Sequence, residues 1–298
     1  MARDEITYLI LHLCSAGYKM REAIKEKKKK LIEKYGESLF ENEDLARHEI
    51  EITSMKALEK YLEGNNLTEK FEIFTEDKDF SYPELKEKYL LLFDPIDGTN
   101  NYLRSIGEST ISMAMSKGYK PQDLVGGVVV RLRKNEVLAS IGSHNYKYYK
   151  SELDSFLPNG KYVDRNVKLE NSVAVIDLHL LRKKGSLSVS NLIKKVKSPR
   201  YFGCVSKSLV DLGIGKVDIV VGSGRPWDYA AALLYAKNSG KYFAFINPLH
   251  GEEIFKDKSI TYVGAASKRL LEEVLQIISP HYKILSEDDH FIFVESYN

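Results

Sequence analysis

The sequence predicts an α/β protein whose first half, residues 1–150, is α+β and whose second half, residues 151–298, alternates strands with helices. Three observations support this fold class. Two long stretches of helical periodicity open the chain, short apolar runs follow them, and strands alternate with helices after residue 168. This alternation is typical of α/β domains. The polar stretch 142–168, rich in Tyr, Lys, Ser, Asn and Gly, indicates a junction between the halves.

The first half begins with two predicted amphipathic helices, over about 3–35 and 43–63. Apolar residues of the first helix recur at i, i+3, i+4 and i+7, and a glycine follows each stretch as a stop signal. After these helices the residue pattern predicts short strands separated by turns. We expect a mixed or antiparallel sheet that carries both helices on one face. Its strands are predicted at Phe71–Phe74, Tyr89–Phe93, Thr110–Met115, Val125–Arg131 and Glu136–Ile141.

The second half alternates between the two kinds of element. Strands are predicted at Val173–Leu178, Val217–Val221, Tyr242–Ile246 and Thr261–Ala265. Helices are predicted at Ser188–Lys195, from about Ser206, at Asp228–Asn238 and at Lys268–Ile278. We make no functional prediction for the tail after Pro280.

Composition excludes several classes of function. The chain has 298 residues, and 44 Lys and Arg against 42 Asp and Glu give a net charge of +2. No overall field therefore indicates a nucleic-acid or membrane partner. The two cysteines lie far apart, in no metal-binding or redox spacing, and no apolar run reaches the roughly 18 residues of a membrane span. We expect a cytoplasmic protein.

The sharpest motif is Leu91-Leu92-Phe93-Asp94-Pro95-Ile96-Asp97-Gly98-Thr99-Asn100-Asn101-Tyr102. A hydrophobic strand runs into two aspartates three residues apart, followed by glycine and threonine. Ligands of open sheets bind at the carboxyl ends of strands. Two carboxylates beside amides that converge after a glycine suit a magnesium-bound phosphate. The spacing fits neither a calcium loop nor the glycine-lysine phosphate loop.

Two further acidic centres stand elsewhere in the chain. Asp228, in Arg225-Pro226-Trp227-Asp228-Tyr229-Ala230-Ala231, is placed where a helix N-cap is expected. Thr75-Glu76-Asp77 directly follows a predicted strand. Capping and a solvated strand end would explain each of them taken alone.

Together these motifs resemble the inositol monophosphatase family of magnesium-dependent sugar-phosphate phosphatases. The first string matches the family's Asp-Pro-Ile-Asp-Gly-Thr-x-Asn-aromatic motif, and the second matches its Trp-Asp-x-Ala-Ala motif. The resemblance extends from about Ile6 to Ile278. It implies a layered α-β-α-β-α sandwich, a phosphoric monoester hydrolase that uses two or three Mg²⁺ ions, a homodimer, and inhibition by lithium.

The resemblance also implies roles for particular residues. Glu76, Asp94 and the carbonyl of Ile96 would bind one Mg²⁺, and Asp94, Asp97 and Asp228 a second. Thr99 would orient or deprotonate a metal-activated water that attacks phosphorus directly. Glu51 stands where the family has the aspartate that pairs with this threonine. The implied catalytic residues are thus Glu76, Thr99 and Glu51, and the implied substrate contacts are Asp97, Gly98, Thr99 and Gly203. Arg225 is a further candidate substrate contact, because it lies three residues before Asp228.

Substrate recognition departs from the family pattern. Inositol-specific members carry a glutamate about seven residues before the tryptophan-linked aspartate, but Val220-Val221-Gly222-Ser223 offers no carboxylate. Arg225 suits a second phosphate, which suggests a bisphosphate such as fructose 1,6-bisphosphate or a nucleotide 3'(2'),5'-bisphosphate.

Two alternatives stay open. One is the haloacid-dehalogenase-like phosphatases, whose Asp-x-Asp-Gly-Thr motif is mimicked here with one extra residue between the acids. The other is a family member that has lost turnover and acts as a binding or regulatory protein, for which the changed upstream motif and Glu51 leave room.

Overall fold

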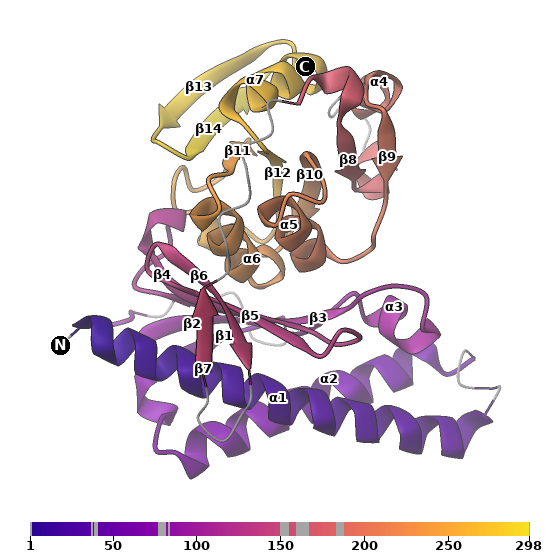
Figure 1. Cartoon of the computed structure of the whole chain (residues 1–298), viewed down its shortest axis with the longest axis vertical. Helices are drawn as coiled ribbons and strands as arrows, with labels where there is room; N and C mark the ends of the chain where they lie inside the picture. Colours follow the sequence, from indigo (N-terminus) through magenta and orange to yellow (C-terminus); the bar gives the residue numbers. More distant parts are fainter. Residues whose placement is uncertain are drawn as a thin grey trace.

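Five layers alternate between helices and sheets (Figure 1). The structure is a computed structural model that describes residues 2–36, 38, 41–76, 82, 84–149, 155–158, 167–182 and 188–297. Helices α1 and α2 cover one face of a seven-stranded sheet, α5 and α6 lie between this sheet and a second seven-stranded sheet, and α4 and α7 cover the far face of the second sheet. The predicted α/β class and α-β-α-β-α layering are confirmed. The helices are α1 Ala2–Tyr35, α2 Glu43–Gly64, α3 Thr99–Arg104, α4 Val189–Lys195, α5 Val205–Gly213, α6 Pro226–Asn238 and α7 Lys268–Ile278.

The first sheet follows the chain in simple order, β1-β2-β3-β4-β5-β6-β7. β1 and β2 are parallel and every later neighbouring pair is antiparallel, so the prediction of a mixed sheet with both helices on one face is confirmed. The predicted junction contains β6 and β7, which the sequence analysis did not foresee. The strands are β1 Phe71–Phe74, β2 Tyr89–Asp97, β3 Thr110–Ser116, β4 Leu124–Arg131, β5 Glu136–Ile141, β6 His144–Tyr149 and β7 Ser155–Pro158.

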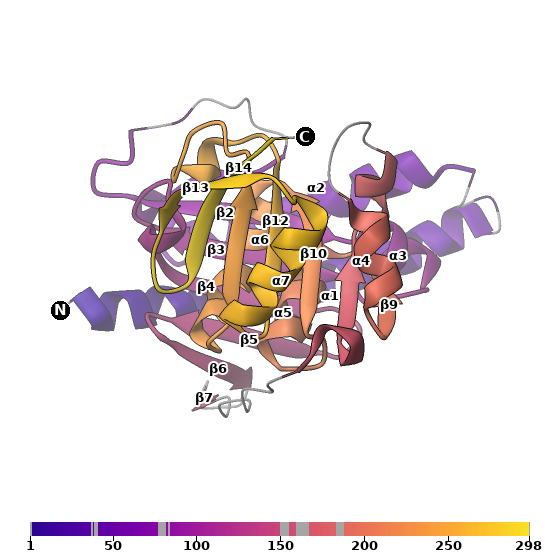
Figure 2. The same cartoon turned by 90° about the horizontal axis from the view of Figure 1, so that it is seen from above.

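The second sheet has the order β13-β14-β11-β12-β10-β8-β9 (Figure 2). The tail after Pro280 completes it, because β14 pairs in parallel with β11 and β13 forms the outer edge. The predicted boundary at residues 150 and 151 lies outside the described residues, and the division into two domains stays a prediction. The strands are β8 Val173–Ile176, β9 Ser198–Arg200, β10 Ile219–Gly224, β11 Tyr242–Ile246, β12 Ile260–Ala265, β13 Tyr282–Glu287 and β14 Phe291–Ser296.

Apolar residues on both faces of the central strands build three cores between the five layers. On β2, Leu90 and Leu92 face α5 and α6, whereas Leu91 and Phe93 face α1 and α2. Successive side chains of a strand point to opposite faces, so a strand covered on both sides reads as a continuous apolar run. This explains why the sequence signal of β2 is so clear.

Close packing places α6 on the first sheet. Gly127 of β4 lies under Ala231, and a Cβ on Gly127 would lie 3.2 Å from the Cα of Ala231. A larger side chain there would push the helix away from the sheet. Among the described helices, none is both long and apolar enough to cross a membrane.

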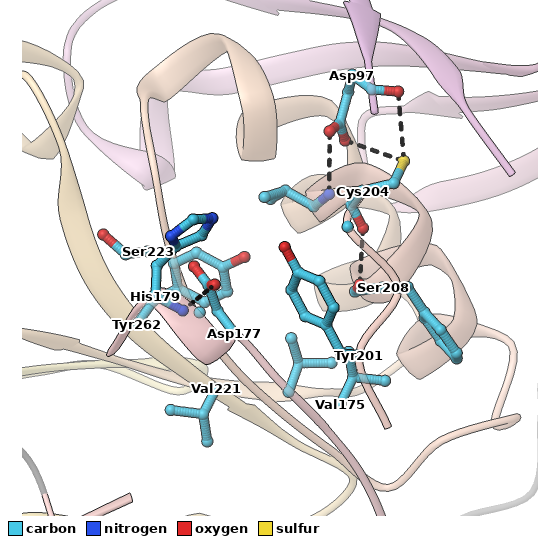
Figure 3. Close-up of a pocket in the computed structure, with 15 residues that line it drawn as sticks. Asp97, Val175, Asp177, His179, Tyr201, Cys204, Ser208, Val221, Ser223 and Tyr262 are labelled. Atoms are coloured by element: carbon cyan, nitrogen blue, oxygen red, sulfur yellow. Dashed lines mark hydrogen bonds between the residues drawn. The ribbon is translucent and has the colours of Figure 1, made fainter. Parts of the chain in front are cut away.

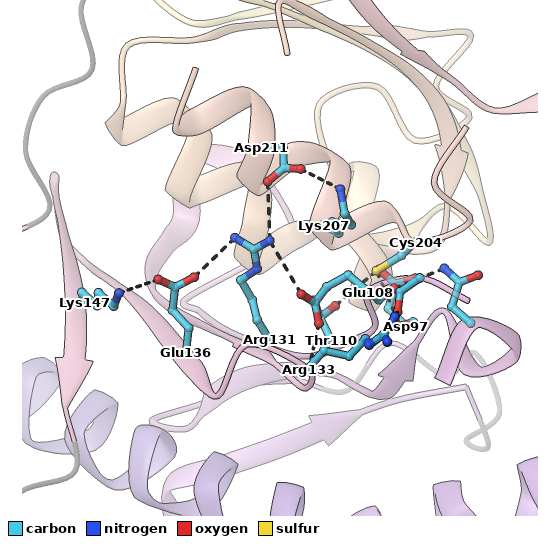
Figure 4. Close-up of polar contacts among 12 residues, drawn as sticks. Asp97, Glu108, Thr110, Arg131, Arg133, Glu136, Lys147, Cys204, Lys207 and Asp211 are labelled. Carbon is cyan, nitrogen blue, oxygen red and sulfur yellow. Dashed lines mark hydrogen bonds and ion pairs between the residues drawn. The ribbon is translucent and has the colours of Figure 1, made fainter. Parts of the chain in front are cut away.

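A buried arginine lies where the first sheet meets α5 (Figure 4). The Arg131 side chain, 3% exposed, lies 3.8 Å from Glu108, 3.3 Å from Glu136 and 3.8 Å from Asp211 of α5. Lys207 contacts Asp211 at 2.6 Å, on the far side from the arginine. This cluster links the two sequence halves through charge.

Candidate active site

The parallel pairing of β1 and β2 explains why acidic residues gather at one sheet edge. Carboxyl ends of neighbouring parallel strands meet at the same edge, so Glu76, two residues after β1, lies beside the end of β2. Asp94 and Asp97 lie within the last four residues of β2, where the register with β3 is irregular. Pro95 stands inside this irregular stretch, where a missing N–H donor is tolerated. The motif therefore ends the strand at the sheet edge.

The N-terminus of α6 adds the fourth acid. The rings of Phe74, at the end of β1, and Trp227, in the first turn of α6, meet edge to face with centroids 5.5 Å apart. This contact holds the start of α6 beside the end of β1. The prediction that Asp228 is the N-cap of this helix is wrong. Arg225 is the N-cap, because Pro226 has a preset φ and starts the helix, and the third helical residue, Asp228, accepts a hydrogen bond at Oδ2 from the Arg225 N–H at 2.8 Å.

These segments enclose a cavity of about 340 Å³. Nine of the ten predicted site residues line this cavity, and the tenth, Glu51, contacts the lining residue Thr99. Asp77, part of the third acidic centre, lies outside the described residues. The lining residues are Arg47, Glu76, Asp94, Ile96, Asp97, Gly98, Thr99, Asn100, His179, Tyr201, Gly203, Arg225 and Asp228.

Burial and mutual repulsion raise the pKa values of the three aspartates. Burial raises the pKa of Asp94 well above its usual range, and the charges of Asp228 and Asp97 add to the effect. The pKa of Asp228 rises to about 7, through burial first and the charge of Asp97 second. The pKa of Asp97 is also raised by burial, against the opposing hydrogen bonds from Ser206. Gathered carboxylates of this kind are stabilised by protons or by cations.

Protein groups contact all four acids: besides the bond to Asp228, Asp94 Oδ1 accepts from the Ile96 N–H at 2.9 Å. Asp97 Oδ2 accepts from the Ser206 N–H at 2.6 Å, and Oδ1 accepts from the Val205 N–H at 3.1 Å, both in the first turn of α5. Glu76, with a side chain 43% exposed, pairs with the guanidinium of Arg225. Arg225 thus faces a predicted metal ligand, and its predicted contact with a second phosphate stays a prediction.

The donor set fits Mg²⁺ in chemistry but is not assembled around one point. All the predicted ligands are carboxylate or carbonyl oxygens, which Mg²⁺ prefers. Among the described residues, the buried Thr75 Oγ1, next to Glu76, has no hydrogen-bond partner. Within the described part of the chain, no three His, Cys, Asp or Glu side chains already surround a common position. Metal binding would therefore draw these side chains closer together around the ion.

Gly98 joins the acidic motif to the second half of the chain. Its φ is +78°, and a Cβ there would lie 3.0 Å from the Cβ of Cys204 and 3.1 Å from the carbonyl oxygen of Gly203. A left-handed residue in such close contact has to be glycine. The predicted phosphate-binding segment and the predicted substrate contact at Gly203 are thereby brought together.

The Thr99 hydroxyl and the Glu51 carboxylate lie within hydrogen-bond distance of each other. Thr99 Oγ1 lies 3.2 Å from Glu51 Oε1 and 2.9 Å from the carbonyl oxygen of Ile96. The longer glutamate of α2 therefore reaches the threonine. Glu51 Oε1 also accepts a hydrogen bond from Arg47 Nε at 2.9 Å, and the Arg47 guanidinium lies 3.9 Å from Glu76.

Four lining residues were missed by sequence reasoning: Arg47, Asn100, His179 and Tyr201. Arg47 had a usable signal, because it precedes Glu51 by four residues and such helix positions are neighbours. Asn100 lies inside the matched motif. His179 and Tyr201 carry no signal, since only the tertiary fold brings their segments to the cavity.

The metal-free protein should lose stability as the pH rises through the range of the raised pKa values. An unfolded aspartate has a pKa of about 3.9, so between pH 4 and 7 the folded protein binds more protons than the unfolded chain, and the free energy of unfolding falls with rising pH. Mg²⁺ should oppose this loss at pH 8, where the aspartates are ionised. We expect the Tm increase caused by 10 mM Mg²⁺, relative to EDTA, to be several degrees at pH 8 and to vanish at pH 5. Equal increases at the two pH values would contradict this prediction.

The protein is a layered α-β-α-β-α sandwich of the sugar-phosphatase type, with an acidic cavity at the carboxyl ends of β1 and β2. The chain belongs to the inositol monophosphatase family, whose sequence profile matches residues 6–283. Membership in this family supports a phosphatase.

Individual relatives agree with this family. The chain is 25% identical over 213 residues to the putative Nus factor SuhB of Neisseria meningitidis serogroup B, covering 67% of this chain and 73% of that protein. Inositol monophosphatase II of Staphylococcus aureus MSSA476 has the same fold, with a TM-score of 0.68 at 16% identity over 94% of this chain and 97% of the other. An inositol monophosphatase/NADP phosphatase complexed with NADP and Ca²⁺ also has a TM-score of 0.68, at 18% identity over 93% and 96% of the two chains.

Proposed function

We propose that this protein is a Mg²⁺-dependent phosphatase that hydrolyses a small phosphomonoester, such as an inositol, sugar or nucleotide phosphate. The main supporting observation is the cavity that four acids line together, one just after β1, two at the end of β2 and one in the first turn of α6. The family supports the reaction, and the Ca²⁺ and NADP held by one structural relative support a site for a divalent cation and a phosphorylated ligand.

Two or three Mg²⁺ ions would be held at this cavity. Glu76, Asp94 and the Ile96 carbonyl would hold one, and Asp94, Asp97 and Asp228 a second, with Asp94 shared. When bound, Mg²⁺ neutralises charge on the phosphoryl and leaving oxygens and favours ionisation of water. The chain itself binds and orients: the amides of Gly98 and Thr99 hold the phosphate, and Gly203 lies against the substrate.

Thr99 and Glu51 would act on the attacking water. The Thr99 hydroxyl orients that water toward phosphorus, and Glu51, within hydrogen-bond distance of the hydroxyl, receives the proton that the hydroxyl passes on. Arg47 holds the Glu51 carboxylate in place and keeps positive charge near it. Attack by water is direct, so no phosphorylated protein side chain forms.

Thr99→Val should lower kcat by about 100-fold, because it removes the hydroxyl and keeps the size of the buried side chain. Thr99→Ser, which keeps the hydroxyl, should retain most of the activity. The measurement is the initial rate of phosphate release at saturating Mg²⁺. A valine variant with more than half of the wild-type kcat would refute the assigned role.

One assay separates the main alternatives. Phosphate release is measured from a panel of sugar, inositol and nucleotide phosphates, including fructose 1,6-bisphosphate and a nucleotide 3',5'-bisphosphate, with Mg²⁺ and with EDTA. Mg²⁺-dependent release supports the proposal. A phospho-aspartyl protein trapped during turnover would instead favour haloacid-dehalogenase-like chemistry.

A binding or regulatory protein without turnover is the second candidate. The SuhB relative, named a putative Nus factor, favours this reading, as do the protein contacts that occupy Glu76 and Asp97. Metal and substrate binding without phosphate release from any member of the panel would support it.

We further propose a cytoplasmic homodimer that is sensitive to lithium and has no nucleic-acid or membrane partner. Sedimentation equilibrium tests the dimer, and the phosphatase assay with added LiCl tests the inhibition.

A further inference from the structure

A second cavity, of about 210 Å³, adjoins the acidic cavity (Figure 3). The two cavities share Asp97, His179, Tyr201 and Gly203, so a molecule whose phosphate lies at the acids can extend into the second space. Val175 of β8 and Val220 of β10, adjacent in the parallel register, line it with apolar surface.

A carboxylate stands at the edge of this apolar surface. Asp177 directly follows β8, and its backbone N–H donates to the Val221 carbonyl oxygen at 2.8 Å, which holds the residue against β10. Asp177 Oδ1 accepts from the His179 N–H at 2.9 Å. In the part of the chain that the structure describes, no protein group donates to Oδ2. Figure 3 shows Asp177, Tyr201 and Tyr262 around the same space.

The charge of the second cavity is negative. Of its described lining residues, Asp97 and Asp177 are carboxylates and none is a lysine or an arginine. An anionic group placed there would be repelled at short range and would lose its hydration beside apolar walls. A group with N–H or O–H donors would instead form a charge-assisted hydrogen bond with Asp177.

Resting on the phosphatase activity proposed above, we infer that this cavity receives the leaving group of the substrate and that Asp177 selects leaving groups that carry hydroxyl or ammonium donors over those that carry a second phosphate. The carboxylate that the segment Val220-Val221-Gly222-Ser223 does not offer is thus supplied by the neighbouring parallel strand. Asp177 is then a specificity-determining residue.

The experiment compares matched phosphomonoesters. Cyclohexyl phosphate and myo-inositol 1-phosphate share a six-membered ring, and only the second carries donors. Wild type should prefer the inositol ester by at least about 10-fold in kcat/KM, and Asp177→Ala should lower this ratio about 10-fold. Asp177→Asn, which keeps the size of the side chain, should lower it in the same direction and serves if the alanine variant folds poorly.

The matched control is Asp288→Ala. Asp288 makes the same local turn contact, since its Oδ1 accepts from the His290 N–H at 2.9 Å, but it lies between β13 and β14 and lines neither cavity. This variant should leave the ratio unchanged. Ratios within twofold of wild type in both Asp177 variants would overturn the inference.

Two further esters sharpen the outcome. 4-Aminocyclohexyl phosphate distinguishes an ammonium from a hydroxyl donor: the ester that loses more rate in Asp177→Asn identifies the donor, and loss for either one supports the inference. Inositol 1,4-bisphosphate should be a poorer substrate than the monophosphate, and the opposite order would overturn the selection against a second phosphate.

If the proposed phosphatase function is wrong, the wild-type protein will hydrolyse none of these esters. Calorimetry with Ca²⁺ in place of Mg²⁺ then measures the affinities of the first two esters. The same tenfold change in their ratio on Asp177→Ala would support the assignment of Asp177, and an unchanged ratio would overturn it.

Discussion

Asp94→Asn should abolish phosphatase activity and at the same time stabilise the metal-free protein at pH 8. Asp94 is the proposed shared ligand of two Mg²⁺ ions, so we expect kcat/KM to fall by about 10³-fold or more. The same carboxylate has a pKa well above its usual range because of burial and the neighbouring charges of Asp228 and Asp97. Its ionised form therefore opposes folding, and a neutral amide of the same shape removes that cost.

The measurement pairs steady-state kinetics with thermal unfolding in EDTA. The Tm of Asp94→Asn should exceed that of wild type at pH 8 and approach it at pH 5, and added Mg²⁺ should raise it less. Asp218→Asn is the control, since Asp218 accepts from the Val173 N–H at 2.9 Å, at the opposite end of β10 from the cavity. It should retain activity. A lower Tm of Asp94→Asn in EDTA at pH 8 would contradict the proposed electrostatics.

Arg131→Met should destabilise the protein by about 3–5 kcal/mol at neutral pH. The methionine keeps much of the volume but leaves the carboxylates of Glu108 and Asp211, each 6% exposed, without their shared cation. Among the described residues, Glu108 has no other ion-pair partner, and Asp211 keeps Lys207 at 2.6 Å. The loss of a buried counter-charge costs more than the loss of a surface pair.

Urea unfolding measures this effect. Arg269→Met, which breaks an exposed i,i+4 pair with Glu273, is the matched arginine control and should cost less than about 1 kcal/mol. Asp211→Asn added to Arg131→Met should recover part of the loss, because it removes one of the two buried carboxylates that lost the Arg131 charge. A cost of Arg131→Met no larger than that of the control would show that the cluster is hydrated rather than buried.

Local patterns explain why most elements were predictable. Strands such as β2 have apolar residues on both faces, and α1 and α2 have periodic apolar stripes, so their signals depend on nearby residues alone. The edges of the second sheet were harder. β14 has an apolar core segment, Phe291–Val294, but its parallel partner β11 lies more than 40 residues earlier, and its place in the sheet depends on that distant pairing.

The start of α6 shows a second reason why sequence patterns can mislead. An aspartate before an alanine-rich stretch resembles an N-cap, yet Pro226 begins the helix two residues earlier and moves Asp228 to the third position. The side chain then bonds back to the Arg225 N–H, and its carboxylate stays at the cavity. Capping and ligand geometry compete for the same residue type, so the pattern by itself could not separate them.

The sequence by itself determined the order and kind of most elements, the family, and the acids proposed to bind metal, because apolar periodicity and a strand that ends in Asp-Pro-Ile-Asp-Gly-Thr are local properties. Only the tertiary structure decided which side chains meet. The packing of α5 and α6 between two sheets brings the Asp97 carboxylate to the backbone N–H groups in the first turn of α5. It also brings the Arg225 guanidinium to Glu76. The same packing opens a second cavity beside Asp177. These contacts join residues more than 70 positions apart, and no local preference of the chain specifies them.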